Sequence, residues 1–459
     1  MTARGRKKFR RHIAALFALS RWKESRMSYL GALARGMTGP ALLLALVPVA
    51  GAEPDLGRCL RQLRAEAPKH GVRREVFDQY TRDVKYDAKR ALPDTEAPEL
   101  KWPIWEYLAV LVDDQRIADG RRMMQEQRDA LAKIEKRFGV DPATVVAIFG
   151  IETNFGAHKP RYAVIETFVN RSCGFPDARP AFKQEQKRHL FHALELLQSG
   201  AVKEPEFLGS RAGAFGMTQF MPDTYVRDRV DIDGDGRADI INSVPDALGA
   251  SARFLVRNGW KPGLPWAVAV TLPAKFDPRL AAAEFDHARL DRGQRAAGKV
   301  KTIAQWRKLG VKISDERLAG AKKAYPAFSD NTPATLLLPE GAEAGRKGPA
   351  FLVTRNFVAF WRYNNSDVYA FAVGTLADLL RGEKQRNIVW SSNEVGLSRR
   401  QIAALQALLI KRGHGHVQVD GVPGPVTRDA VRSEERWLGW PETGYLRLRL
   451  LEALQGTAQ

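Results

Sequence analysis

One glutamate in the sequence stands where a carboxyl group could exchange protons with a substrate. Asp141-Pro142 is typical of a helix start, and the helix can continue until Gly156. On this helix Glu152 shares one stripe with three apolar side chains, those of Val145, Ile148 and Phe149. Because an apolar setting raises the pKa of a carboxyl group, Glu152 could donate a proton and later take one back. The alternative is a core glutamate that pairs with an arginine, or one that reaches solvent from the helix end.

A glycine-rich segment, residues 209–222, could form the floor of a site for a polar ligand. Its small residues let the backbone approach a bulky ligand closely. Ser210 and Gln219 add short hydrogen-bonding groups beside that floor. The alternative is a structural loop that ends at Pro222.

Aromatic and amide side chains gather in residues 362–369. Tyr363 and Tyr369 could stack on a sugar ring or hydrogen-bond to it. Asn365 and Ser366 are equally typical of a helix cap, so this segment has two interpretations.

An acidic loop begins at residue 231. Its carboxylates fall at positions 1, 3, 5 and 9, namely Asp231, Asp233, Asp235 and Asp239. With Gly236 at position 6, this is the first half of an EF-hand calcium loop. Position 12 is Asn242, which has no carboxylate, so Asp246 is expected to close the site and the Arg237 carbonyl to add a ligand. We expect structural calcium here; the alternative is an acidic surface turn whose side chains cap the backbone.

The elements that must position these groups are expected to be mainly α, in an α+β arrangement. In chain order we expect an N-terminal extension at 1–52, a helical layer at 53–135, a core at 136–272, a β insertion at 273–355, a closing helix at 356–385, a linker at 386–395 and a small helical unit at 396–455. Within the insertion, apolar runs predict strands at 334–339 and 350–354. The candidate chemistry therefore lies mostly in the core.

The composition is typical of a folded protein, and the N-terminal segment predicts that it is exported. Of 459 residues, 44% are hydrophobic and 27% charged, and no stretch reaches the roughly 18 apolar residues of a membrane span. The formal net charge is +20, of which the first 52 residues contribute +9. The apolar run 41–50 and the small residues after it predict a signal peptide, with the mature chain beginning near Glu53 and the start codon at Met1 or Met27. The alternative for this extension is a basic arm that binds nucleic acid.

Two cysteines, Cys59 and Cys173, are compatible with an oxidising compartment. They could form one bridge or remain two buried free thiols. Cys59 lies well past the expected cleavage site, so we expect no lipid anchor and a periplasmic or cell-envelope location.

The chain shows no basic-aromatic interleaving, and we therefore expect no nucleic-acid partner.

Four sequence blocks together resemble the lytic murein transglycosylases of the membrane-bound lytic transglycosylase B family. They are Gly150-Ile-Glu-Thr-Asn-Phe-Gly156, Gly209-Ser-Arg-Ala-Gly-Ala-Phe-Gly216, Gln219-Phe-Met-Pro222 and Tyr363-Asn364, in the family's order. The resemblance implies a lysozyme-like catalytic core with a helical layer, a small β insertion and a single EF-hand-like calcium site. It also implies cleavage of the β-1,4 bond between N-acetylmuramic acid and N-acetylglucosamine of peptidoglycan, which leaves 1,6-anhydromuramic acid ends.

The resemblance assigns roles to individual residues. Glu152 corresponds to the single catalytic acid/base. The positions that match the family's substrate groove are Ser210, Gln219, Tyr363 and Asn364. Relatives carry a compact Arg-Arg-aromatic segment after the catalytic helix; here residues 171–182 differ, and Arg179 is expected to take the arginine's role.

The implied mechanism fits these blocks. Most glycosidases use two carboxylates, whereas no second carboxylate accompanies Glu152 in the motif blocks. Glu152 would protonate the glycosidic oxygen and then deprotonate the C6 hydroxyl of the same sugar, so that intramolecular attack replaces water. The competing functions are a muramidase that adds water and a non-catalytic peptidoglycan-binding protein.

The last unit has its own signature. The turn Asp420-Gly-Val-Pro-Gly-Pro425, which leads into a helix, resembles the small three-helix peptidoglycan-binding domain. Residues 433–437 replace the Phe-Gln pair that is usual in its next helix. We expect peptidoglycan glycan strands as the partner, and other wall enzymes are compatible with this organisation.

Overall fold

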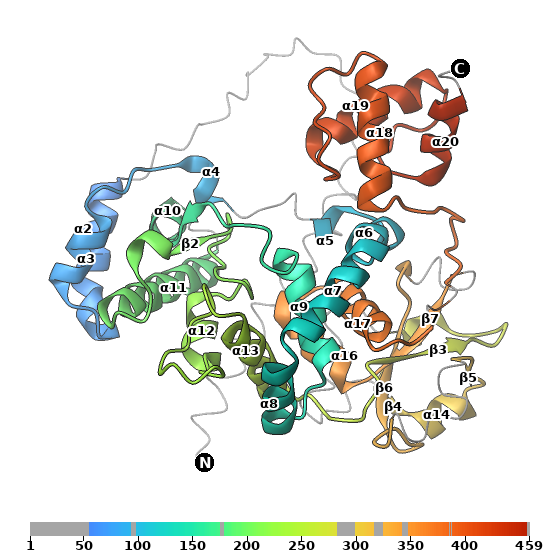
Figure 1. Ribbon diagram of the computed structural model, residues 1–459, viewed down its shortest axis with the longest axis horizontal. Coiled ribbons are helices and arrows are strands. Elements are labelled where there is room, and N and C mark those ends of the chain that lie inside the picture. Colours follow the sequence, from blue (N-terminus) through green and yellow to red (C-terminus); the bar gives the residue numbers. More distant parts are fainter. Residues whose placement is uncertain are drawn as a thin grey trace, which may run out of the picture. The chain divides into compact units, whose positions relative to one another are not determined.

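The computed structural model describes residues 55–92, 98–174, 179–281, 299–315, 325–341, 348–384, 386 and 388–456. Most of this chain is helical, and the strands of its larger sheet are drawn in yellow to orange in Figure 1. The signal-peptide prediction for residues 1–52 lies outside the described residues. Within the described part, every helix is too short or too polar to cross a membrane.

The helices expected as one layer over 53–135 separate into two groups. The first group packs on α10 (Val164–Gly174) and α11 (Pro180–Gln198) and consists of α2 (Leu56–Glu66), η1 (Ala67–His70), α3 (Arg74–Thr81) and α4 (Ala88–Ala91). After the short α5 (Pro98–Lys101), the second group packs around the centre of the core and consists of α6 (Ile104–Leu111), α7 (Asp114–Glu126) and α8 (Arg128–Phe138). In Figure 1 the two groups appear in blue and in teal. Helical periodicity identifies a buried face but not the partner that covers it, which explains the difference.

The first group is joined covalently to the core. Cys59 of α2 and Cys173 of α10 form a disulfide with their Cα atoms 5.7 Å apart. Of the two alternatives left open by the sequence, the structure has the bridge.

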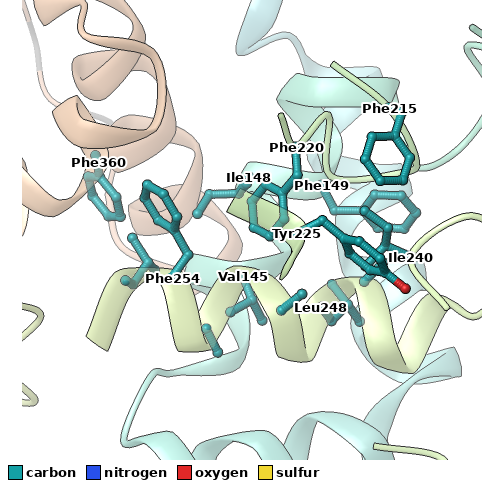
Figure 2. Close-up of a cluster of buried hydrophobic side chains, with 14 of the residues drawn as sticks. Val145, Ile148, Phe149, Phe215, Phe220, Tyr225, Ile240, Leu248, Phe254 and Phe360 are labelled. Carbon is teal, nitrogen blue, oxygen red and sulfur yellow. The ribbon is translucent and has the colours of Figure 1, made fainter. Parts of the chain in front are cut away.

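The centre of the core is α9 (Pro142–Thr153). It contacts α7, α8, α13 (Val244–Arg257) and α17 (Asp367–Leu380). Nine of its twelve residues are buried, so the helix is covered on all sides and not on one stripe as expected. Figure 2 shows its apolar side chains interleaved with those of α12 (Pro222–Asp228), α13 and α16 (Arg355–Asn364).

The β insertion is a five-stranded antiparallel sheet in the order β4-β6-β7-β3-β5. Its strands are β3 (Ala267–Thr271), β4 (Lys301–Thr302), β5 (Lys312–Ile313), β6 (Pro333–Leu337) and β7 (Ala350–Val353), with α14 (Ile303–Lys308) after β4. β6 and β7 lie where strands were predicted, whereas β3 falls in the segment assigned to the core. Val268, Leu336 and Leu352 pair across three strands and face a separate small cluster around Trp306, while the alternate residues face the main core.

The remaining elements complete the frame. A two-stranded sheet, β1 (Tyr162–Ala163) and β2 (Leu208–Gly209), lies beside the 3-10 turn η2 (Glu204–Glu206), and η3 (Pro278–Leu280) follows β3. The C-terminal unit has the three expected helices, α18 (Arg399–Lys411), α19 (Pro425–Trp437) and α20 (Leu448–Gly456), around their own apolar cluster.

Candidate active site

The end of α9 places Glu152 in the last helical turn. The helix begins at the predicted cap, Asp141, but ends at Thr153, before Gly156. Asn154 and Phe155 have left-handed φ angles of 49° and 57°, an unusual conformation for residues with side chains. The helix therefore stops abruptly, and Glu152 is half-buried at its exit from the core.

A buried tyrosine contacts this carboxylate. Tyr369 lies in α17, is 1% exposed, and its hydroxyl donates a hydrogen bond to Glu152 Oε1 at 2.5 Å. Burial and the charge of Glu152 raise the pKa of Tyr369 well above its usual value, so the phenol stays protonated. The sequence suggested that Tyr369 could contact a sugar; the structure instead places its hydroxyl on Glu152.

A second tyrosine links this pair to the glycine-rich segment. The ring of Tyr363 stacks on that of Tyr369, with centroids 6.1 Å apart. Its hydroxyl donates to the Thr218 carbonyl oxygen at 2.9 Å and lies 3.3 Å from Ser251 Oγ. Burial, followed by the charge of Glu152, raises the pKa of Tyr363 well above its usual value. No motif in the sequence indicated that Thr218 and Ser251 would contact this tyrosine.

The glycine-rich segment is a tight turn that supports the site. Ser210 Oγ accepts hydrogen bonds from the backbone N–H groups of Ala212 and Ala214, both at 3.2 Å. Gly213 has φ of 91°, and a Cβ there would meet the Phe168 ring at 2.4 Å, so no larger residue fits. This segment therefore forms a structural turn, as in the alternative interpretation of the sequence. Such a turn can also support a binding site.

A pocket of about 570 Å³ opens beside this turn. Gln219 and Tyr363 line it, together with the aromatic rings of Phe182, Phe220 and Phe254. The Gln219 backbone is left-handed, with φ of 51°, and its side-chain amide donates to the Gly216 carbonyl at 2.9 Å. Two of the predicted substrate residues thus share one concave surface.

The wall of the pocket is strongly charged. Four arginines line it, namely Arg171, Arg188, Arg227 and Arg362. Asp223 is 5% exposed and lies 3.3 Å from His189 and 3.0 Å from Arg227. Although burial alone would raise the pKa of Asp223, the close contact with His189 and the neighbouring positive charges hold it well below its usual range. The wall therefore carries net positive charge.

The structure brings the predicted residues together to different degrees. Glu152 joins Tyr363 through Tyr369, and Tyr363 and Gln219 line the pocket. Ser210 is half-buried in its turn, and Asn364 is exposed at the end of α16. Arg179 is the exposed N-cap residue of α11 and is not among the residues that line this pocket.

The acidic loop converges only in part. Ligand oxygens of Asp231, Asp233 and Asp246 all lie within 4.8 Å of one another. Asp235 instead accepts the backbone N–H of Arg237 at 2.8 Å, as in the alternative of a self-capped turn. Three convergent carboxylates are a donor set that calcium accepts, so these residues fit the ion.

Asp246 also connects the two ends of this loop. It is fully buried and accepts the backbone N–H groups of Ile232 and Asp239 at 2.7 and 2.8 Å. Burial, followed by the nearby charge of Asp233, raises the pKa of Asp246. A cation at this point would offset the repulsion between the carboxylates.

Two known families match separate parts of the chain. Residues 55–378 match the family described as "Transglycosylase SLT domain", and residues 398–454 match "Putative peptidoglycan binding domain". The chain is 26% identical over 318 residues to membrane-bound lytic murein transglycosylase B of Escherichia coli K12, a match that covers 67% of this chain and 78% of that protein.

Solved structures show the same similarity. The crystal structure of SltB3 from Pseudomonas aeruginosa in complex with NAG-anhNAM-pentapeptide is 36% identical, covers 87% of this chain and 99% of its own, and superposes with a TM-score of 0.61. The Escherichia coli lytic transglycosylase Slt35 in complex with calcium is 23% identical, covers 70% of this chain and 92% of its own, and has a TM-score of 0.55. At 23% identity, the similarity to Slt35 shows that the two proteins share a fold.

Proposed function

The chain belongs to the transglycosylase SLT-domain family and is a peptidoglycan lytic transglycosylase, and on this premise we propose that Glu152 is its single catalytic acid/base. The observation that carries the proposal is the hydrogen bond from buried Tyr369 to a half-buried Glu152, together with the stacking of Tyr369 on Tyr363, which lines the pocket with Gln219. A carboxyl group that is fixed at the border of a core can exchange protons with a substrate in the pocket.

The reaction proceeds without water. Protonated Glu152 donates its proton to the glycosidic oxygen as the bond from that oxygen to C1 of the N-acetylmuramoyl residue breaks. The N-acetyl group stabilises the positive charge that develops at C1. The C6 hydroxyl oxygen of the same residue then bonds to C1, and its proton passes to Glu152, which is restored for the next turnover. Holding both groups in one ring gives the attack its proximity advantage.

The other predicted site residues have distinct parts in this scheme. Tyr369 holds the carboxylate in one orientation through its hydroxyl. Ser210, Gln219, Tyr363 and Asn364 bind the glycan. Tyr363 supplies an aromatic ring that suits a sugar face, and Gln219 an amide that suits its hydroxyl and N-acetyl groups.

The arginines suit the peptide part of the substrate. Peptidoglycan stem peptides carry carboxylates, and guanidinium groups bind carboxylates through paired hydrogen bonds. We assign this role to Arg179 at the start of α11 and to Arg188 on the same helix, whose side chain lines the pocket.

The test of Glu152 is product analysis by mass spectrometry. We expect wild-type protein to release muropeptides with 1,6-anhydro ends from purified sacculi and E152Q to release none, because the amide cannot donate or accept this proton. Products with reducing ends from wild-type protein would identify the hydrolytic muramidase instead. Wall binding without any product would support a non-catalytic binding protein.

Calcium is assigned a structural role in the acidic loop. Asp231, Asp233 and Asp246 would hold it through carboxylate oxygens, with Asp235 and the Arg237 carbonyl as the further ligands expected from the EF-hand pattern. A bound calcium ion would supply positive charge between the loop and the start of α13, on which Asp246 lies.

The protein acts on the cell wall and therefore belongs to the cell envelope. We assign its export to the first 52 residues, and the N-terminal sequence of the secreted protein, expected near Glu53, checks this. We assign to the peptidoglycan-binding domain at 398–454 a second contact with the wall. In place of the usual Phe-Gln pair, the buried side chains of Glu434 and Glu435 form ion pairs within the domain, with Arg412 and Arg447 respectively.

A further inference from the structure

The C-terminal unit is held against the catalytic region by buried contacts. Its apolar cluster, which includes Leu397 and Ile402, also contains Val110 of α6. Arg428 of α19 pairs with Glu106 of α6 at 2.5 Å, and the Glu106 side chain is fully buried. These contacts give α18, the first helix of the unit, a defined place beside α6 and α7.

Arg399, the first residue of α18, forms a two-point ion pair with the catalytic region. Its Nε and Nη2 atoms donate to the two carboxylate oxygens of Asp113 at 2.7 and 2.9 Å. The Asp113 side chain is 2% exposed and also caps the start of α7. Such a planar pair fixes the direction of the guanidinium group as well as its position.

The remaining amine group of Arg399 contacts the end of the catalytic helix. Its Nη1 atom donates to the side-chain oxygen of Asn154 at 3.0 Å. Arg116 of α7 donates to the same oxygen at 3.3 Å, and burial lowers the pKa of Arg116 to about 10. Two guanidinium groups therefore hold one amide oxygen, one from the catalytic region and one from the C-terminal unit.

Asn154 determines how α9 ends. It follows Glu152 by two positions, has the left-handed conformation, and its backbone N–H closes the last turn on the Gly150 carbonyl at 3.1 Å. Asparagine adopts this conformation more readily than most residues with a side chain, and contacts with its surroundings hold it in place. The two arginines provide that hold immediately after the proposed acid/base.

We propose that Arg399 is a positioning residue that acts through Asn154 to fix the direction of Glu152. The inference rests on the proposed role of Glu152. It means that the C-terminal unit contributes to turnover itself, in addition to any contact that it makes with the wall.

The test compares four variants on a soluble glycan fragment and on sacculi. R399Q removes the guanidinium group that contacts Asp113 and Asn154. N154G removes the amide oxygen but keeps a residue that accepts left-handed φ. R399Q/N154G combines the two changes. R400Q, the exposed neighbour on α18, is the matched control. We expect R399Q and N154G each to lower kcat for the soluble fragment by about 10-fold to 100-fold with KM little changed, the double variant to lose no more than the worse single, and R400Q to match wild type.

A further variant separates positioning from folding. R399K can pair with Asp113 but cannot reach Asn154 at the same time, so we expect it to restore the Tm lost in R399Q without restoring kcat. Full recovery of kcat in R399K, additive losses in the double variant, or a loss seen only with sacculi would each overturn the proposal. E152Q is measured alongside: an active E152Q removes the premise, whereas an inactive E152Q with an unaffected R399Q removes only this inference.

Discussion

At the scale of single residues, the site depends on how one carboxylate is held. Glu152 leaves the core at the last turn of α9 and meets the hydroxyl of Tyr369, a residue 217 positions away in the sequence. A second ring, that of Tyr363, stacks on the first and lines the pocket. The two stacked rings therefore connect Glu152 with the pocket.

Removal of the Tyr369 hydroxyl tests this arrangement. We expect Y369F to lower kcat by about 10-fold to 100-fold, because Glu152 loses its fixed orientation, while the free energy of unfolding falls by only about 1 kcal/mol. Steady-state kinetics and thermal melting measure the two effects. Y325F is the matched control, because Tyr325 donates to Glu383 at 2.5 Å in a pair outside the site. Equal kcat in Y369F and wild type would contradict the role of the hydroxyl.

At the scale of elements, a disulfide and a buried carboxylate connect segments of the catalytic region. The disulfide joins α2 to α10 across 114 residues of sequence. The acidic loop is joined to the start of α13 by the side chain of Asp246. Neither link touches Glu152, so both are expected to act on stability.

Loss of the disulfide should lower stability and leave the chemistry intact. We expect C59S/C173S to reduce the free energy of unfolding by about 2–5 kcal/mol, since a closed loop of this length restricts the unfolded chain. Denaturant unfolding measures this, and wild-type protein under reducing conditions is the control that should show the same loss. A large fall in kcat at a temperature where the variant is folded would show that the link also shapes the site.

Removal of calcium should destabilise the protein reversibly. We expect a chelator to lower the Tm and excess calcium to restore it, with a stabilisation of about 3 kcal/mol when calcium is 100-fold above its Kd. D233N, which keeps the shape of the side chain but removes one charge, should lose most of this response. An identical Tm with and without chelator would contradict the proposed ion.

At the scale of the whole molecule, the described chain behaves as a catalytic region with a C-terminal unit that is docked on it. The docking depends on a buried carboxylate, Glu106, and on its partner Arg428. Burial raises the pKa of Glu106, and the charge of Arg428 opposes that rise.

Removal of Arg428 should therefore make stability depend on pH. In R428M the pKa of Glu106 rises further, so the folded state holds a proton that the unfolded state releases above its own pKa of about 4.3. We expect the loss to be small near that pH and to grow to about 3–5 kcal/mol as the pH rises towards 8. Urea unfolding at several pH values measures this. The double variant R428M/E106Q should lose the pH dependence, and its persistence would show that another group is responsible.

Local sequence patterns were enough to predict much of the local structure and to identify the candidate site residues. The cap at Asp141, the strands β6 and β7, the three C-terminal helices and the acidic loop depend on neighbours a few residues apart, so local patterns predict them. The family blocks supplied Glu152 and the groove residues by resemblance.

The contacts that those residues make could not be predicted from the sequence and follow from how the elements pack. The contact of Tyr369 with Glu152 and the contact of Arg399 with Asn154 join positions 217 and 245 apart. The all-round burial of α9 and the division of the first helices into two groups have the same origin. Periodicity reports that a face is covered, but the covering partner is selected by packing among all elements at once, and that information is not local in the chain.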